Sequence, residues 1–301
     1  MGSRTIEFYD DGRTWRNTVS NDSVIHSTNP DKITFSHVSP QGSVAYAQSN
    51  DKIHYTRGAV LERVQRRSAF KKVFVAPPPP PPPSADPYFS DVVALLHMDG
   101  TDGSTTFTDV KGNTFTPAGN AQIDTSQSKF GWASGLFDGS GDYITSGAIV
   151  GMPLGTGDFT VEFFVRPAIV GSGYAGLLAT PSPSGYVGGG LYIRRSGGTI
   201  EVLMNGSSTP VAQATSAWSA NVWIHVAVTR ESGSVRLFIE GVLQGSAKTN
   251  TTNLTGTTVR FGYSTQDAGS YNGWADELRI TKGVARYTAN FTPPTEPFLD
   301  L

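Results

Sequence analysis

The segment from Asp158 to Arg166 reads Asp-Phe-Thr-Val-Glu-Phe-Phe-Val-Arg. Apolar residues recur at every second position, and this apolar set is Phe159, Val161, Phe163 and Val165. A period of two is that of a β-strand. Phe164 breaks the alternation, so both faces of the strand are predicted to be partly covered. Two packed sheets explain such a strand better than a single open sheet does.

Shorter segments of the same kind lie on both sides of this strand. Turn residues separate them, such as Glu231-Ser232-Gly233-Ser234 and Glu240-Gly241, which suit hairpins. The segments are residues 190–194, 199–204, 223–229, 235–240, 258–263 and 277–281. We therefore predict an all-β fold, with a β-sandwich of ten or more strands in the C-terminal part of the chain.

The chain has 301 residues, a length that suits two domains. Its formal net charge of −2 argues against bulk binding of nucleic acid. The absence of cysteine excludes disulfides and cysteine metal ligands. No apolar segment has the length of a signal-peptide core at the start, or of a membrane-spanning helix elsewhere. We expect a soluble protein made in a cytoplasm, with no membrane insertion.

Seven consecutive prolines, Pro77 to Pro83, divide the chain. Because proline fixes φ and lacks an N–H, the run is predicted to be a semi-rigid rod about 20 Å long, at ~3.1 Å per residue. Residues 1–76 carry 11 Lys or Arg and 7 Asp or Glu, whereas residues 84–301 carry 12 and 18. The predicted domains are a basic N-terminal domain (1–76), a linker (77–85) and an acidic C-terminal domain (86–301). A stalk that presents the C-terminal domain and an ordinary linker both fit this pattern.

The N-terminal domain is predicted to be small and β-rich, from short β-type segments at residues 4–9, 32–38, 43–47 and 52–55. Between residues 59 and 75 the apolar residues recur at near-helical spacing, and five basic residues accompany them: Arg63, Arg66, Arg67, Lys71 and Lys72. We predict that this amphipathic element binds an acidic partner surface. A solvated basic face on a terminal helix is the alternative, and nucleic acid is a weaker choice.

Several stretches of the C-terminal domain resemble laminin-G-like domains with the concanavalin A-like jelly roll. They are residues 92–99 (VVALLHMD), 128–131 (SKFG), 136–144 (LFDGSGDYI) and 157–163 (GDFTVEF). Residues 223–230 and 237–241 stand where that family has its strand–hairpin–strand core. The ending, residues 274–287 followed by 291–294 (FTPP), is similar to the versions found in bacteriophage structural and tail-fibre proteins. The resemblance covers about residues 86–301 and no part of 1–76.

This resemblance implies a fold that serves lectins, adhesion modules, glycosidases and structural spacers. Glycosidases of this fold carry two Glu and one Asp alternating along one strand, which puts three carboxylates on one face. No strand here has that pattern, because Glu162 stands alone and Glu201 begins a segment without a second acid. We therefore expect no enzymatic activity. His225 lies within a β-segment and is interpreted as a packed residue of the sandwich.

Calcium is the ion that the sequence favours. Asp109 and Asn113 place a carboxylate and an amide oxygen in one turn, and Asp276 precedes the last strong strand. In a jelly roll that strand returns beside the first one. Oxygen ligands of this kind suit Ca²⁺, and the resemblance implies a structural ion there in some members. The alternative is that Asp109 and Asn113 bond the backbone of their own turn.

Ligand recognition by this domain would use aromatic residues in loops, because sugars stack on rings through apolar faces and bond polar side chains through hydroxyls. The candidate ligand-binding residues are Tyr174, Tyr186, Tyr263, Tyr271, Trp274, Gln266 and Asp267. Packing under the edge of the sandwich is the alternative role for Trp274.

Two functions fit these features. In the first, the protein is a bacteriophage virion component (a tail fibre, head fibre or decoration protein) assembled in the host cytoplasm. Residues 1–76 would bind other virion proteins, and many copies or a homo-oligomer would present the C-terminal domain to a host-surface glycan, gaining affinity by multivalency. In the second, the protein is a non-viral bacterial carbohydrate-binding or adhesion module.

Overall fold

The computed structural model describes residues 85–301, apart from 172, 182–188, 216–217 and 265–268, together with the strands of residues 1–84. By its contacts the chain divides into two compact units, Met1–Ser84 and Ala85–Leu301. The proline run lies outside the described residues. In the part of the chain that is described, no helix has the length and apolar character needed to span a membrane.

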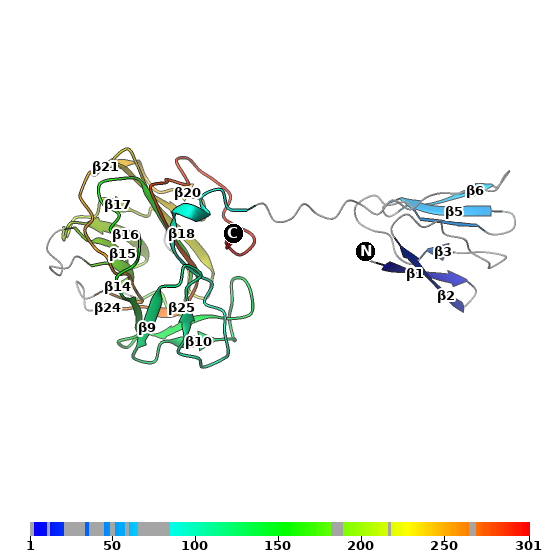
Figure 1. The fold of residues 1–301 in the computed structure, drawn as a ribbon, viewed down its shortest axis with the longest axis horizontal. Coiled ribbons are helices and arrows are strands. Elements are labelled where there is room, and N and C mark those ends of the chain that lie inside the picture. Colours follow the sequence, from blue (N-terminus) through cyan, green and yellow to red (C-terminus); the bar gives the residue numbers. More distant parts are fainter. Residues whose placement is uncertain are drawn as a thin grey trace. The chain divides into compact units, whose positions relative to one another are not determined.

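The N-terminal unit contains two three-stranded antiparallel sheets (Figure 1). The first joins β1 (Ser3–Asp10), β2 (Arg13–Ser20) and β3 (Thr34–Phe35), and the second joins β4 (Ala45–Gln48), β5 (Lys52–Arg57) and β6 (Val60–Gln65). The helical spacing predicted from residue 59 onward is wrong over Val60–Gln65, where the chain pairs with β5 in a hairpin. Val60 and Val64 fit a period of two as well as a helical one, and the adjacent strand decides between the two.

Residues 85–301 form a sandwich of two antiparallel sheets, which confirms the predicted all-β jelly roll (Figure 1). The nine-stranded sheet has the order β10-β11-β25-β13-β18-β19-β20, with β7 beside β25 and β21 beside β19. Its strands are β7 (Val92–Leu96), β10 (Gln122–Asp124), β11 (Ser134–Asp138), β13 (Phe159–Pro167), β18 (Ile224–Glu231), β19 (Ser234–Ile239), β20 (Val242–Leu243), β21 (Lys248–Thr249) and β25 (Asn272–Lys282).

The eight-stranded sheet has the order β17-β16-β15-β14-β22-β12-β9-β8. Its strands are β8 (Phe107–Thr108), β9 (Thr114–Ala118), β12 (Tyr143–Ser146), β14 (Tyr174–Thr180), β15 (Leu191–Ser196), β16 (Thr199–Met204), β17 (Ala212–Gln213) and β22 (Arg260–Phe261). A hairpin of β23 (Tyr263–Ser264) and β24 (Gly269–Ser270) and a single 3₁₀ turn, η1 (Phe89–Asp91), complete the described part of the unit.

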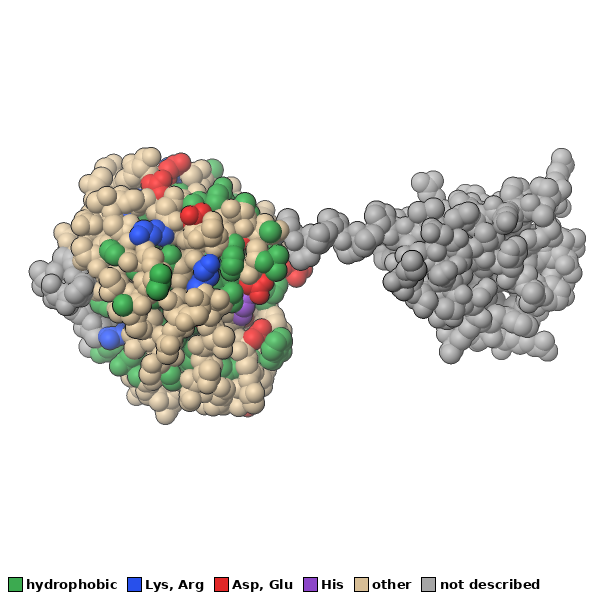
Figure 2. Space-filling model, viewed as in Figure 1, with side chains coloured by type: hydrophobic (Ala, Val, Ile, Leu, Met, Phe, Trp, Pro, Cys, Tyr) green, Lys and Arg blue, Asp and Glu red, His purple; other side chains and the backbone are tan. Residues whose placement is uncertain are grey.

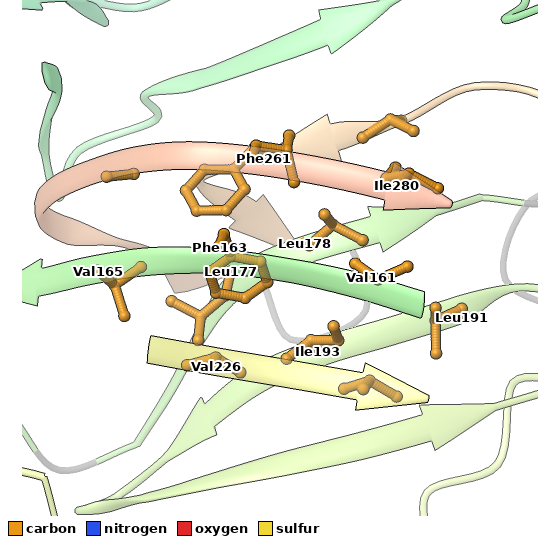
Figure 3. Close-up of a cluster of buried hydrophobic side chains, with 14 of the residues drawn as sticks. Val161, Phe163, Val165, Leu177, Leu178, Leu191, Ile193, Val226, Phe261 and Ile280 are labelled. Carbon is orange, nitrogen blue, oxygen red and sulfur yellow. The ribbon is translucent and has the colours of Figure 1, made fainter. Parts of the chain in front are cut away.

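The alternating strand of the sequence is β13, which lies between β25 and β18 in the nine-stranded sheet. Its inward side chains Val161, Phe163 and Val165 face the eight-stranded sheet across the core (Figure 3). Phe163 contacts Phe261 edge to face, with ring centroids 5.2 Å apart. Phe164, on the opposite face, is only 1% exposed. The predicted cover on both faces of this strand is therefore confirmed.

A β-bulge in β25 turns two polar residues toward the outer side of the nine-stranded sheet. Glu162 of β13 pairs with Arg279, whereas Phe164 pairs with Asp276, so the register shifts between them. Glu277, within the bulge, has a φ of +53°, a conformation that residues other than glycine rarely adopt. Because the bulge adds one residue, Asp276 and Arg279 share a face although they are three positions apart.

This outer face holds a buried ionic network centred on Glu162, which has no exposed surface. Arg279 donates to Glu162 Oε1 from Nε at 2.9 Å and from Nη2 at 2.8 Å, and the Tyr287 hydroxyl donates to Oε2 at 2.9 Å. Asp86 accepts from Arg279 Nη1 at 3.2 Å and from Arg286 Nη2 at 2.7 Å. Burial alone would raise the pKa of Glu162, but the positive charges of Arg279 and Arg286 and the hydrogen bond with His225 together outweigh it, and the pKa is lowered to about 2.

The ends of the C-terminal unit cover this network. The rings of Tyr287 and Phe291, from the segment after β25, lie 6.4 and 5.7 Å from the ring of His225. His225 is fully buried, in agreement with its interpretation as a packed residue. The backbone N–H of Asp86 donates to the Leu301 carbonyl at 2.8 Å. The first and last residues of the unit therefore meet, and they belong to a third layer over the nine-stranded sheet.

Replacing Arg279 by methionine is predicted to destabilise the C-terminal domain by about 3–5 kcal/mol, because Glu162 then stays buried without its main counter-charge. Urea unfolding of the wild type and of Arg279→Met at pH 7 measures the difference. The control is Glu231→Gln, since Glu231 pairs with Arg236 at 3.1 Å while 42% of its own side chain is exposed. A loss below about 1 kcal/mol is expected for the control. Equal losses in the two variants would contradict this role of the network.

Candidate ligand-binding surface

The outer face of the eight-stranded sheet carries rings and charges in regular order. Strand alternation places Ile193 and Val202 in the core and their neighbours Arg194 and Glu201 on the outer side. Across the sheet the outward side chains are Gln213 of β17, Glu201 of β16, Arg194 of β15, Tyr174 of β14, Arg260 of β22 and Tyr143 of β12, with Tyr263 of β23 beside Tyr143. We call these seven residues the tyrosine–arginine face.

Guanidinium groups and tyrosine rings contact one another across this face. Arg194 Cζ lies 4.0 Å from the ring centre of Tyr174, and Arg260 Cζ lies 4.7 Å from that of Tyr143. The rings of Tyr143 and Tyr263 stack with centroids 5.9 Å apart. Tyr174 is 48% exposed. The rings are thus held in fixed orientations by cations and by each other, and part of their surface is open to a ligand.

The two arginines of this face differ in their partners. Arg194 Nε donates to Glu201 Oε2 at 2.9 Å, and Glu201 Oε1 also accepts from Gln213 Nε2 at 3.2 Å. Arg260 pairs with no carboxylate among the described residues, and its Nε is buried without a hydrogen-bond partner there. Figure 2 shows acidic, basic and hydrophobic side chains interspersed over the visible side of the C-terminal unit. The described residues on that side therefore form no broad field of one charge sign.

Two of the predicted ligand-binding residues, Tyr174 and Tyr263, come together on the tyrosine–arginine face. Tyr271 does not lie on this face, because it is 1% exposed and its ring packs beside Phe137 in the core. Its hydroxyl donates to the Trp274 carbonyl at 2.9 Å. Burial raises the pKa of Tyr271 well above its ordinary value.

Trp274 lies on the other sheet, away from these tyrosines. Its Nε1 donates to Asp124 Oδ2 at 2.8 Å, and the guanidinium of Arg166 lies 5.0 Å from its ring. This agrees with the packing alternative rather than with ligand binding. The remaining candidates, Tyr186, Gln266 and Asp267, lie outside the described residues.

Tyr143, Arg194 and Arg260 were missed in the sequence. The sequence does contain a pattern that predicts the outward position of Arg194, because this residue alternates with core residues along β15. It also pairs with Glu201 in the next strand. Tyr143 and Arg260 meet only through the pairing of β12 with β22, which are far apart in the chain. No local pattern reports such a pairing.

The three predicted calcium ligands belong to two separate arrangements. Asp109 Oδ1 accepts from the N–H of Leu95 at 2.7 Å and of Lys111 at 3.2 Å, and Oδ2 accepts from the N–H of Asn113 at 3.0 Å. The Asn113 side-chain amide also bonds Asp109, as the turn-bonding alternative describes.

Asp276 lies within β25 rather than before it, because this strand begins at Asn272. Its Oδ2 accepts from the N–H groups of Lys129 and Phe130 at 2.7 and 3.2 Å, and Oδ1 is buried without a partner. Among the described residues, no group of three or more His, Cys, Asp or Glu is placed to hold a metal ion. Calcium binding stays a prediction.

The basic residues predicted to bind a partner are only partly described. Arg63 lies on β6, and Arg66, Arg67, Lys71 and Lys72 lie outside the described residues. Partner binding by this segment also stays a prediction.

Residues 138–286 match the family model described as the concanavalin A-like lectin/glucanases superfamily. This matched region lies within the C-terminal domain and is laminin-G-like, with the concanavalin A-like fold. The match confirms the resemblance seen in the sequence. Among curated protein sequences, none matches the chain.

Solved structures with a similar fold include binding domains of botulinum neurotoxins. One is the binding domain of neurotoxin DC in complex with rat synaptotagmin II, with 14% identity, a TM-score of 0.50, and coverage of 65% of this chain and 50% of that chain. The receptor-binding domain of neurotoxin type G has 15% identity and a TM-score of 0.49, covering 65% and 49%. The present chain thus spans about half the length of these structures. At 14% identity, the similarity to the neurotoxin DC binding domain concerns the fold alone.

Asp276 is predicted to make the domain less stable as pH rises. Burial, together with the negative charges of Glu277 and Asp99, raises the pKa of Asp276 to about 8, against an ordinary value of 3.8. The folded state therefore binds this proton more tightly than the unfolded state, and its contribution to stability is lost between about pH 4 and pH 8. Thermal melts of the wild type and of Asp276→Asn from pH 5 to pH 8.5 measure the effect.

The wild type should lose melting temperature relative to Asp276→Asn as pH rises, and parallel curves would contradict the prediction. The same melts with added Ca²⁺ test the calcium prediction. Ca²⁺ replaces the proton on a carboxylate, so it should stabilise the wild type most at pH 8 and leave Asp276→Asn unchanged. No Ca²⁺ effect on the wild type would contradict the predicted site.

Proposed function

We propose that the C-terminal domain is a glycan-binding module whose ligand lies on the tyrosine–arginine face. The observation that carries this proposal is the fixed array of Tyr143, Tyr174 and Tyr263 with two arginines on one outer sheet face. Tyrosine rings stack on the apolar faces of sugars, and guanidinium groups donate hydrogen bonds to sugar oxygens. The description of the superfamily names lectins and glucanases, which supports this ligand class.

Binding is favoured over hydrolysis. Most glycosidases place two carboxyl groups about 5–10 Å apart around the bond they cleave. Among the described strand residues that point outward from the eight-stranded sheet, Glu201 is the one carboxylate, and Arg194 and Gln213 hold it. Glu162 lies in the other sheet with no exposed surface. A lectin-like role agrees with these positions.

We further propose that the chain is a bacteriophage virion protein that displays this module in many copies. Asp86 follows the linker directly, and its carboxylate bonds Arg279 and Arg286 on the outer side of the nine-stranded sheet. Asp86 therefore lies on the outer side of one sheet, while the tyrosine–arginine face lies on the opposite sheet. The proline run, the basic residues 1–76 and the similarity of the ending to tail-fibre proteins also support display. In this proposal residues 1–76 bind other virion proteins, and the protein is located in the virion.

A non-viral bacterial adhesion module is the second candidate. It would bind glycan through the same face, with Asp86 on the opposite sheet as before. Fractionation separates the two, because an adhesion module remains with the cell envelope whereas a virion protein sediments with particles.

Removing a tyrosine of the face is predicted to weaken glycan binding. A glycan array probed with the multimerised full chain first selects a ligand. Tyr143→Ala and Tyr174→Ala should each weaken its binding by about two- to tenfold, since one aromatic contact is worth about 0.5–1.5 kcal/mol. Trp132→Ala is the control, because Trp132 is 66% exposed and follows a loop whose backbone contacts Asp276 on the other sheet.

Loss of binding in Trp132→Ala with none in the two tyrosine variants would contradict the placement of the site. Absence of any retained glycan would contradict the function.

Deleting residues 1–76 is predicted to abolish attachment to particles and to leave glycan binding intact. Residues 85–301 form their own compact unit, so the truncated protein should keep the melting temperature and glycan affinity of the C-terminal domain. It should no longer sediment with purified particles. A truncated protein that still sediments with them would contradict the anchoring role of residues 1–76.

A further inference from the structure

A second feature, separate from the tyrosine–arginine face, lies at one end of the sandwich. A pocket of about 80 Å³ is bordered there by Arg195, Trp218, Ser270, Tyr271 and Asn272, among others. Arg195 follows Arg194 in β15, and neighbouring residues of a strand point to opposite faces. Arg194 therefore belongs to the outer face, whereas Arg195 points toward the space between the sheets.

Arg195 is a buried cation that has no counter-charge among the described residues. It is 8% exposed, and burial lowers its pKa without an opposing contribution from any described carboxylate. An arginine side chain nevertheless keeps its proton at physiological pH. A buried charge is unfavourable unless it is paired or fully hydrogen-bonded.

Arg230 illustrates how the same domain satisfies a buried guanidinium. Its Nε, Nη1 and Nη2 donate to three main-chain carbonyls at 2.8, 2.8 and 2.6 Å. In Arg195 only Nη1 donates, to the carbonyls of Gly171 and Gly197. Nε and Nη2 of Arg195 form no hydrogen bond with a described residue. Arg195 therefore retains donors as well as a charge.

Two further donors border the same pocket. Trp218 Nε1 is buried and has no hydrogen-bond partner among the described residues. Ser270 Oγ accepts from the N–H of Gly141 at 2.8 Å, so its own hydrogen is free to be donated elsewhere. No acidic side chain is among the described residues that line the pocket.

We propose that this pocket binds a small oxyanion group, namely a sulfate, a phosphate or a carboxylate, between Arg195 and Trp218. A guanidinium matches two oxygens of such a group in a fork, and the indole N–H can donate to a further one. The pocket, with a volume of about 80 Å³, has room for a small oxyanion group beside these donors. The group is either a free inorganic anion or the acidic group of a larger ligand. The inference goes beyond the proposed glycan site and does not depend on it.

The indole N–H signal of Trp218 in a ¹H–¹⁵N spectrum of the full chain tests this directly. The chain has five tryptophans, and Trp218→Phe assigns the signal while keeping most of the ring volume. Sodium sulfate and sodium phosphate are titrated against sodium chloride at equal ionic strength, and sodium glucuronate is titrated in parallel. The Trp218 signal should move with saturation.

A response to sulfate or phosphate identifies a free-anion site, whereas a response to glucuronate alone identifies the acidic group of a glycan. Arg195→Gln should weaken the response by about tenfold or more, because it removes a charge-assisted interaction. Arg236→Gln, at a partly exposed ion pair with Glu231 on the other sheet, should leave it unchanged. If Arg195→Gln fails to fold, Arg195→Lys keeps the charge without the fork and should weaken the response less. A Trp218 signal that moves with none of the three anions, or equally in both glutamine variants, would overturn the proposal.

Discussion

The ion pair of Glu162 and Arg279 is the interaction on which the outer layer of the C-terminal domain depends. Glu162 is the polar centre of the alternating strand, and the bulge at Glu277 turns Arg279 to the same face. A buried carboxylate requires both a counter-charge and donors. Arg279 supplies the charge, and Tyr287, from the segment after the last strand, supplies a further donor. The hydrogen bond from Tyr287 thus holds that segment against the sheet. Arg279 also bonds Asp86, so this residue lies against the same face.

This arrangement assigns different roles to the two outer faces of the sandwich. The two ends of the C-terminal unit cover the nine-stranded sheet, and the polar groups of this face stabilise the fold. The eight-stranded sheet keeps exposed rings such as Tyr174, together with Arg260, which contacts the Tyr143 ring and pairs with no described carboxylate. The proposed glycan site therefore lies on the face that the ends of the unit leave open.

The sandwich was predictable from the sequence because its signals are local: a period of two in β13 and turn residues at the hairpins. The site was predictable only in part. The predicted residues Tyr174 and Tyr263 lie on one outer face, but Tyr271 points into the core because it directly precedes β25, whose register is set by distant strands. Arg260 and Tyr143 become neighbours through long-range pairing, which no spacing rule reports. The spacing after residue 59 fitted a strand as well as a helix, and the neighbouring strand decided between them.

Hydrogen–deuterium exchange of the full chain, with and without a glycan chosen from an array, tests most directly whether recognition belongs to the eight-stranded sheet. The account predicts that bound glycan slows exchange in β12, β14, β15, β16 and β22, and leaves β13, β18 and β25 unchanged. Slower exchange confined to β13, β18, β25 or to the segment after Lys282 would contradict it.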